Sequence, residues 1–201
     1  MNLRKSRVKL LRVAFCSFAL LALLVAPYER QGINVVLDFT CHWTGYVLLM
    51  AGLGLRMWAI LYVGQRKSRE LTTTGPYSLC RNPLYVGTFL LTLGTALSFE
   101  NVAMLAFAVV VVIPIHVAVV LAEEKHLRAL FGEQYVQYMQ RTPRFWFRLS
   151  AYNSAPEVNI PVRTLRRAIF DAVGILCIPP LASLVDTLQD NNILPVLWHW
   201  P

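Results

Sequence analysis

The stretch LYVGTFLLTLGTALSF-EN-VAMLAFAVVVVIPIHVAVVL, residues 84–121, decides the fold. Its two apolar runs, Leu84–Phe99 and Val102–Leu121, are joined by the polar dipeptide Glu100-Asn101. A helix needs about 20 apolar residues to cross a bilayer, so the second run is long enough and the first is slightly short. The pattern predicts a helical hairpin in a membrane, whose two outer ends return to the same face.

Polar tracts flank both outer ends of this hairpin. The tract before it contains Gly75-Pro76-Tyr77 and Arg81-Asn82-Pro83-Leu84-Tyr85-Val86-Gly87. The tract after it contains Glu123-Glu124, Phe131-Gly132, Tyr135, Tyr138 and Arg141-Thr142-Pro143. A hairpin would bring chemically capable groups from both tracts to one face of the bilayer. Such a site is suited to hold a water-soluble reagent beside a lipid-embedded one.

The composition also points to a membrane protein. Of 201 residues, 56% are hydrophobic and only 15% are charged, whereas soluble domains carry about 25% charged residues. Three further apolar segments run approximately over Val13–Ala26, Trp43–Gly64 and Ala168–Leu188. We therefore expect an all-α, polytopic integral membrane protein. It would have about five transmembrane helices, including the hairpin, and a short cytoplasmic helical cap.

The basic residues predict the orientation. All of the 19 Lys and Arg residues except Arg30 and Arg56 fall on one side if every segment crosses. By the positive-inside rule, the N-terminus and both polar tracts face the cytoplasm, and we expect a bacterial inner membrane. The net charge of +8 then reflects topology and attraction to anionic lipid headgroups, and no nucleic-acid partner is expected.

The chain divides into a core, residues 1–150, and a C-terminal part, residues 151–201, that consists of a linker and an appended transmembrane helix. Asn, Ser and Pro residues mark the linker, and Pro179-Pro180 interrupts the last span. The first apolar segment is expected to remain uncleaved, because Pro27 follows the small residue Ala26. The four cysteines show no paired spacing, so neither a disulfide framework nor a metal site is predicted.

Pro83 fits the first turn of a helix. The free N–H groups of that helix start favour an anion, such as the carboxylate of an amino-acid-like ligand. Glu123 and Glu124 lie at the C-terminal end of the second apolar helix, where exposed carbonyls disfavour acids. A cationic or hydroxyl-rich partner is therefore implied. Two alternatives stay open: an interfacial anchor at the first tract, and pairing of the two acids with Lys125 and Arg128.

Other signals are weaker. Phe131-Gly132 predicts the end of a helix, and the spacing of Tyr135 and Tyr138 places both rings on one face of a second short helix. The intramembrane residues Arg56, His116, Asp171 and Asp186 are candidate functional groups by their location alone. Arg56 is also close enough to a helix end to snorkel, and His116, near Pro114, more often satisfies a freed backbone carbonyl.

With these residues in view, the chain resembles the isoprenylcysteine carboxyl methyltransferase family and its relatives, the phospholipid N-methyltransferases. The resemblance covers roughly residues 64–143. It rests on the order and spacing of the Gly75-Pro76-Tyr77 turn, the tract Arg81–Gly87, the run Glu123-Glu124-Lys125-His126-Leu127, the run from Phe131 to Tyr138, and Arg141-Thr142-Pro143. These enzymes are integral membrane proteins that use S-adenosylmethionine.

The resemblance implies a membrane methyltransferase-like core with its cofactor at the cytoplasmic rim. The implied S-adenosylmethionine-binding residues are Arg69, Leu71, Thr72, Tyr77, Arg81, Asn82, Pro83, Leu84, Tyr85 and Glu123. Glu124 and Arg141 are the candidate catalytic residues: Glu124 as a proton acceptor, and Arg141, or Arg144, as the group that holds an acidic acceptor. Two positions depart from the family pattern. Asn82 stands where the family often has His, and Val119 stands where the prenylcysteine enzymes carry a substrate-binding Arg.

We therefore expect an S-adenosylmethionine-dependent methyltransferase that acts on a lipophilic small-molecule, lipid or prenylated acceptor. Methyl transfer by in-line displacement needs mostly alignment and desolvation from the protein. The alternatives are a membrane lipid or steroid reductase that uses a nicotinamide cofactor, and a non-enzymatic membrane scaffold or transporter subunit.

Overall fold

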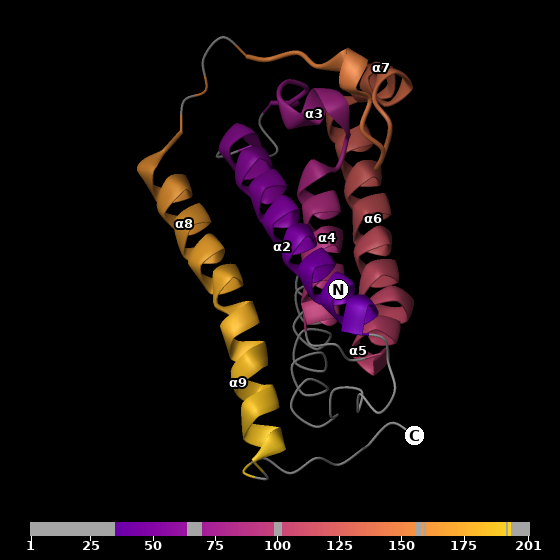
Figure 1. The fold of residues 1–201 in the computed structure, drawn as a ribbon. Coiled ribbons are helices and arrows are strands. Elements are labelled where there is room, and N and C mark those ends of the chain that lie inside the picture. The colour runs from indigo at the N-terminus through magenta and orange to yellow at the C-terminus, as the bar shows by residue number, and fades with distance from the viewer. Residues whose placement is uncertain are drawn as a thin grey trace, which may run out of the picture. The chain divides into compact units, whose positions relative to one another are not determined.

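The structure is a computed structural model that describes residues 35–63, 70–98, 102–155, 158, 160–191 and 193. In these ranges every regular element is helical (Figure 1). The longer helices are α2 (Val35–Val63), α4 (Pro83–Ser98), α6 (Ile113–Phe131), α8 (Val162–Leu176) and α9 (Ile178–Asp190), and the shorter ones are α3 (Pro76–Leu79), α5 (Val102–Phe107) and α7 (Glu133–Arg141). The predicted all-α class is confirmed over the described residues.

Three stretches in the described residues are long and apolar enough to cross a membrane: Phe39–Val63, Val102–Phe131 and Val162–Val185. The apolar helix α4 has 16 residues and is shorter than a full span, as its sequence predicted. The first predicted segment and the Glu100-Asn101 turn lie outside the described residues. The structure therefore supports an all-helical protein with three candidate membrane spans.

The second arm of the hairpin is one continuous run with a local irregularity. Helices α5 and α6 are joined by a π-helical turn, Ala108–Val112. Pro114 follows directly and has no N–H for the normal helical bond, and wide turns of this kind accommodate such a defect. His116 Nδ1 lies 2.8 Å from the Val112 carbonyl oxygen. His116 thus contacts a backbone carbonyl near Pro114, and its expected role of satisfying the carbonyl freed by the proline stays a prediction.

The end of α6 and the bounds of the last span follow local rules. The helix continues to Phe131, ten residues beyond the predicted apolar run, because residues 122–130 are mostly strong helix formers. It stops at Gly132, whose φ of 53° is readily adopted only by glycine. The last span begins at Val162, earlier than predicted, and is interrupted at Cys177, just before Pro179-Pro180 in the first turn of α9.

The described residues form two compact units that interleave along the chain. One unit consists of residues 35–50, 91–98, 102–117, 176–191 and 193, and the other of residues 51–63, 70–90, 118–155, 158 and 160–175. In the first unit, Ala96, Met104 and Ala108 form a buried cluster. The second unit contains both polar tracts. The division at residue 150 stays a prediction.

Glycines allow α2 and α4 to approach closely within each unit. A Cβ at Gly94 would lie 2.8 Å from the Gly45 carbonyl oxygen and 2.8 Å from the Leu49 backbone nitrogen. In the other unit, a Cβ at Gly87 would lie 2.9 Å from the Gly52 carbonyl oxygen. Small residues at such crossings let helix backbones pack tightly in membranes.

We expect Gly94→Ala to destabilise the protein by about 1–3 kcal/mol, because the new methyl group meets backbone atoms that can move only with the helix. The matched control is Gly54→Ala in α2, where a Cβ would meet no atom within 4 Å. Thermal unfolding in detergent should show a clear loss for Gly94→Ala and none for Gly54→Ala. Equal unfolding temperatures would contradict the close crossing.

Candidate functional site

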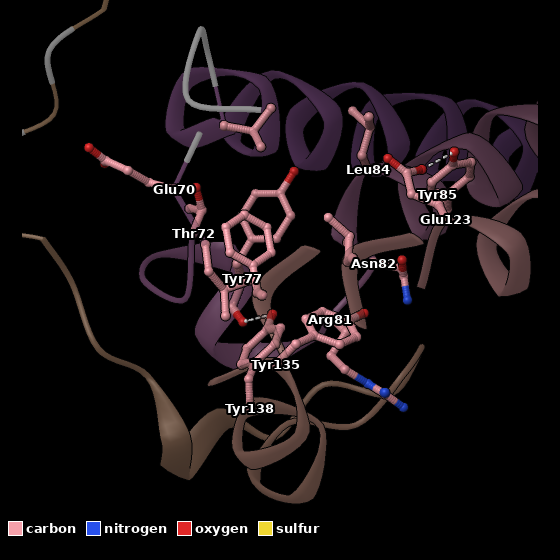
Figure 2. Close-up of a pocket in the computed structure, with 14 residues that line it drawn as sticks. Glu70, Thr72, Tyr77, Arg81, Asn82, Leu84, Tyr85, Glu123, Tyr135 and Tyr138 are labelled. Carbon is pink, nitrogen blue, oxygen red and sulfur yellow. Dashed lines mark hydrogen bonds between the residues drawn. The ribbon is translucent and has the colours of Figure 1, made fainter. Parts of the chain in front are cut away.

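An open pocket lies in the unit formed by residues 51–90 and 118–175, where α3, the start of α4, the end of α6 and α7 meet (Figure 2). Both predicted polar tracts contribute to its wall. The lining residues are Val63, Glu70, Leu71, Thr72, Tyr77, Arg81, Asn82, Leu84, Tyr85, Glu123, Leu127, Phe131, Tyr135 and Tyr138. The expected meeting of the two tracts is thus present in the structure.

The turn that begins the first tract is held by glycine. Gly75 has a φ of 61°, and a Cβ at this position would overlap the Tyr62 ring, so only glycine fits there. Ser78 then locks the turn: its hydroxyl donates to the Gly75 carbonyl at 2.7 Å and accepts from the Asn153 N–H at 3.0 Å. These bonds set the direction in which Tyr77 and Arg81 enter the pocket.

The chain after α7 pairs with this turn. The Arg81 N–H donates to the Pro143 carbonyl at 2.9 Å, and the Arg148 N–H donates to the Leu79 carbonyl at 3.0 Å. The Cys80 thiol adds a bond to the Arg144 carbonyl at 3.2 Å. Burial is the largest cause that raises the pKa of Cys80 to about 11, so this thiol stays protonated and structural. The bonds fix residues 143–148 against the pocket wall.

The backbone carbonyl of Asn82 accepts the first hydrogen bonds of α4, and its side chain bonds to a residue of another helix. Its carbonyl accepts from the N–H groups of Tyr85 and Val86, both at 3.0 Å, and Pro83 occupies the first helical position as predicted. The Asn82 amide nitrogen donates to Glu124 Oε1 at 2.9 Å and lies 3.3 Å from the Arg144 carbonyl oxygen. Asn82 therefore links α4 to α6.

Glu124 is a buried carboxylate, only 6% exposed, that is held by two arginines as well. Arg144 Nε donates to its Oε2 at 3.0 Å, and Arg81 Nη1 lies 3.6 Å from its Oε1. The side chain of Arg81 is 10% exposed and that of Arg144 is 42% exposed. The alternative of local pairing with Arg128 is wrong for Glu124, because Glu124 faces the interior of this unit and Arg128 is exposed.

The adjacent acid has a different environment. Glu123 lines the pocket, and its Oε2 accepts a hydrogen bond of 2.7 Å from the Tyr85 hydroxyl, as Figure 2 shows. This bond crosses from α4 to α6 and orients one carboxylate at the pocket wall. Neighbouring residues on a helix point about 100° apart, which explains why one acid faces the pocket and the next is buried among arginines.

Three tyrosines close the opposite side of the pocket. Tyr135 and Tyr138 are buried with ring centroids 5.9 Å apart, and the Tyr138 hydroxyl donates to the Tyr77 carbonyl at 2.7 Å (Figure 2). Burial, followed by the negative charge of Glu124, raises the pKa of Tyr135 to about 12. Burial also raises the pKa values of Tyr77 and Tyr138 above the ordinary value of a phenol. These rings are therefore neutral, rigid aromatic surfaces.

Two polar atoms of pocket-lining residues lack a partner in the part of the chain that the structure describes. Thr72 Oγ1 and Arg81 Nε are buried and make no hydrogen bond there. A buried polar atom without a partner is costly, about 1–3 kcal/mol. The Thr72 hydroxyl can donate or accept a hydrogen bond and the Arg81 Nε–H can donate one, so both could contact a bound molecule.

Most of the predicted cofactor-binding residues line this pocket: Leu71, Thr72, Tyr77, Arg81, Asn82, Leu84, Tyr85 and Glu123. Pro83 is buried beside it at the start of α4, and Arg69 lies outside the described residues. Of the two predicted catalytic residues, Glu124 is held in the buried ion-pair cluster and Arg141 is exposed at the end of α7. Neither is among the residues that line the pocket.

Sequence reasoning missed Val63, Leu127 and Phe131 as part of the wall, and it gave no individual site role to Glu70, Tyr135 and Tyr138. The one-face spacing of the two tyrosines was the available signal. Among the intramembrane candidates, Arg56 Nη1 donates to the Thr88 hydroxyl at 2.6 Å, away from the pocket lining. Within the described residues, no group of three or more His, Cys, Asp or Glu side chains is arranged to hold a metal ion.

We expect Glu124→Ala to destabilise the protein by about 3–5 kcal/mol, because it leaves the largely buried Arg81 guanidinium without its counter-charge. Arg144→Ala should destabilise the protein less, since the ion pair with Arg81 and the hydrogen bond from Asn82 still hold the carboxylate. Arg141→Ala is the matched arginine control, because Arg141 is exposed. Unfolding in detergent should rank the losses in that order, and a loss for Arg141→Ala as large as that for Glu124→Ala would contradict the assignment.

The raised pKa of Tyr135 predicts a pH dependence of stability. The folded state keeps the Tyr135 proton up to about pH 12, whereas an unfolded phenol releases it near pH 10. The contribution is therefore fully present below about pH 10 and is lost as the pH rises towards about 12. Tyr135→Phe should flatten the fall of the unfolding temperature in that window. The control Tyr152→Phe, at a half-exposed ring, should leave the fall unchanged.

Comparison with known proteins places the chain in a family. The sequence pattern of the phospholipid methyltransferase family matches residues 40–134. The cobalt-zinc-cadmium resistance protein CzcN of Cupriavidus metallidurans is 33% identical over 193 residues, which is 96% of this chain and 87% of that protein. The nickel-cobalt-cadmium resistance protein NccN of Alcaligenes xylosoxydans xylosoxydans is 35% identical over 146 residues, 73% of this chain and 68% of that protein.

A plant enzyme is also similar. Protein-S-isoprenylcysteine O-methyltransferase B of Arabidopsis thaliana is 32% identical over 117 residues, 51% of this chain and 59% of that enzyme. No solved structure matches the chain. The match to the phospholipid methyltransferases contains the whole hairpin, the first polar tract and the first part of the second, up to residue 134. The chain therefore belongs to the isoprenylcysteine carboxyl methyltransferase-like family, related to the phospholipid methyltransferases, and has the resistance proteins CzcN and NccN among its relatives.

Proposed function

We propose that the protein is an S-adenosylmethionine-dependent methyltransferase of the membrane that acts on a lipophilic acceptor. The observation that carries the proposal is the pocket to which both polar tracts contribute, in a chain of this family. Residues as distant in sequence as Thr72, Asn82 and Glu123 line one wall. A scaffold protein has no need for such convergence of carboxylate, guanidinium and phenol groups.

The residues present fit S-adenosylmethionine. This cofactor carries a positive sulfonium and ammonium, a carboxylate, ribose hydroxyls and a flat adenine ring. The carboxylates of Glu70 and Glu123 suit its positive groups, and the buried tyrosine rings suit adenine and the sulfonium. The partnerless Arg81 Nε and Thr72 Oγ1 suit its carboxylate and hydroxyls.

When bound, S-adenosylmethionine would supply an electrophilic methyl group with a neutral leaving group. The protein's part is to orient and to exclude water. Tyr85 fixes the Glu123 carboxylate at the wall, and the apolar side chains of Leu84, Leu127 and Phe131 would help to exclude water around a bound molecule. Electrostatic attraction to Glu123 is strengthened in such a water-poor environment.

We assign Glu124 a positioning role in this site. Its carboxylate accepts hydrogen bonds from Asn82 and Arg144 and forms an ion pair with Arg81, so it fixes two pocket-lining side chains, Asn82 and Arg81. An acceptor that arrives already ionised, such as a carboxylate, needs no general base. Arg141 remains a proposed contact for an acidic acceptor, because it is exposed near the pocket-forming helix α7.

The relatives suggest the biological setting. The plant relative is named for methylation of isoprenylcysteine, which is a lipophilic acceptor, but Val119 occupies the position where that group of enzymes is expected to bind the substrate carboxylate. Two relatives are named for resistance to metals. We propose that any link of this protein to metal resistance runs through a methylated product, because the proposed activity is methyl transfer.

The finer topology is part of the proposal. We propose about five spans, a cytoplasmic N-terminus, and a cytoplasmic cap built from α7 and its flanking turns, in a bacterial inner membrane. The excess of Lys and Arg in the loops beside the pocket supports this orientation. Residues 151–201 would then be a linker and an additional C-terminal span outside the methyltransferase-like core.

We expect purified protein in nanodiscs to bind S-adenosylmethionine, and Glu123→Gln to weaken that binding by about 10-fold to 100-fold. The expected loss corresponds to one hydrogen bond to a charged group, about 1.5–3 kcal/mol. Glu133→Gln is the matched control, because Glu133 is an exposed acid at the start of α7 and does not line the pocket. Equilibrium dialysis with radiolabelled cofactor gives the dissociation constants.

The same measurement separates the rival functions. Absence of binding by the wild type, or equal binding by wild type and Glu123→Gln, would sink the proposal. Competition by a nicotinamide nucleotide in place of S-adenosylmethionine would favour the reductase alternative. Incubation of labelled cofactor with native membranes, followed by extraction, then identifies the methylated acceptor.

A further inference from the structure

The segment that follows α7 exposes large apolar side chains. We call residues 145–149, Phe-Trp-Phe-Arg-Leu, the aromatic segment. Trp146 is 83% exposed, Leu149 is 76% exposed and Phe147 is 38% exposed. Exposed apolar groups clustered in this way mark an interaction site.

The aromatic segment is held in place and is not a loose tail. The Arg148 N–H donates to the Leu79 carbonyl, and Arg81 N–H to the Pro143 carbonyl just before the segment, at 3.0 and 2.9 Å respectively. Phe145 packs on Phe89 of α4, with ring centroids 5.5 Å apart. With Phe145 turned inward, Trp146 and Leu149 are presented outward from a fixed backbone.

The contact with Phe89 gives the level of the segment along α4. Phe89 is six residues beyond Pro83, the first residue of that apolar helix, so it lies about 9 Å along the helix axis at 1.5 Å per residue. The polar start of α4 belongs at the membrane surface. That placement would put Phe145 at the level where headgroups meet hydrocarbon, which is the level that Trp and other aromatic side chains prefer.

The charge of this region favours one kind of lipid. Between Gln134 and Pro156 the sequence contains Arg141, Arg144 and Arg148 and no acidic residue. Arg144 is engaged with Glu124, whereas Arg141 and Arg148 are exposed. Basic groups beside inserted aromatic side chains attract anionic headgroups.

We propose that the aromatic segment is a binding site for anionic phospholipid, in which Trp146, Phe147 and Leu149 enter the interface and Arg148 binds the headgroup phosphate. Because Arg144, which holds Glu124, precedes the segment directly, the lipid is bound beside the wall of the pocket.

The test uses the full chain in nanodiscs and the fluorescence that Trp146 contributes, taken as the difference between wild type and Trp146→Phe. Bromines on the acyl chains quench a nearby tryptophan. We expect brominated phosphatidylglycerol to quench the Trp146 signal more strongly than brominated phosphatidylcholine at the same mole fraction. Arg148→Gln should reduce this preference by roughly fivefold, the value expected for one basic residue near an anionic surface.

Arg128→Gln is the matched control, because it removes the same charge from an exposed position on α6. It should leave the preference for phosphatidylglycerol unchanged. Equal quenching by both lipids, equal effects of Arg148→Gln and Arg128→Gln, or quenching of Trp146 by aqueous iodide in place of lipid would each overturn the inference. The readout involves no methyl transfer, so its failure is separate from a failure of the proposed function.

Discussion

Glu124 accepts hydrogen bonds from the Asn82 amide and from Arg144 Nε, and Arg81 lies within 3.6 Å of it. This buried carboxylate joins the start of α4, the end of α6 and the chain after α7. An ionised group that is taken out of water requires both counter-charge and hydrogen bonds, so the three segments can adopt few other arrangements. The positions of Asn82 and Arg81 in the pocket wall depend on it.

The adjacent acid shows how one helix serves two purposes. Glu123 and Glu124 come from the same turn of α6, yet one lines the pocket with Tyr85 and the other is buried among arginines. The first lies at the pocket wall, while the second is held in the ion-pair cluster that joins the segments of the fold. A membrane enzyme that transfers a small group needs both, because alignment and exclusion of water account for most of its catalytic contribution.

Much of this arrangement could be predicted from local rules. Pro83 at a helix start, Gly132 at a helix end, and Tyr135 and Tyr138 on one face follow from backbone geometry that a short stretch of sequence determines. The convergence of the two tracts followed from the length and polarity of the hairpin. The resemblance to a family supplied the cofactor, and residues such as Thr72 entered the candidate site only through it.

The remaining contacts could not be predicted because they join distant residues. Sequence spacing offered Arg128 as the partner of Glu124, but the partners are Arg81 and Arg144, 43 and 20 residues away. The π-helical turn and the exposure of Trp146 likewise depend on packing that no short window contains. Glu70, before α3, and Phe131, at the end of α6, line the same pocket, and no local sequence pattern shows that they meet.

The most direct test of the central claim is to map the residues that contact bound cofactor. Ultraviolet irradiation of the protein in nanodiscs with radiolabelled S-adenosylmethionine, followed by peptide mapping, reports which residues contact it. We predict label in peptides from residues 70–85 and 123–138, which contain nearly all of the pocket lining, and none in residues 162–190. Label confined to other peptides, or no label that unlabelled cofactor can displace, would contradict the account.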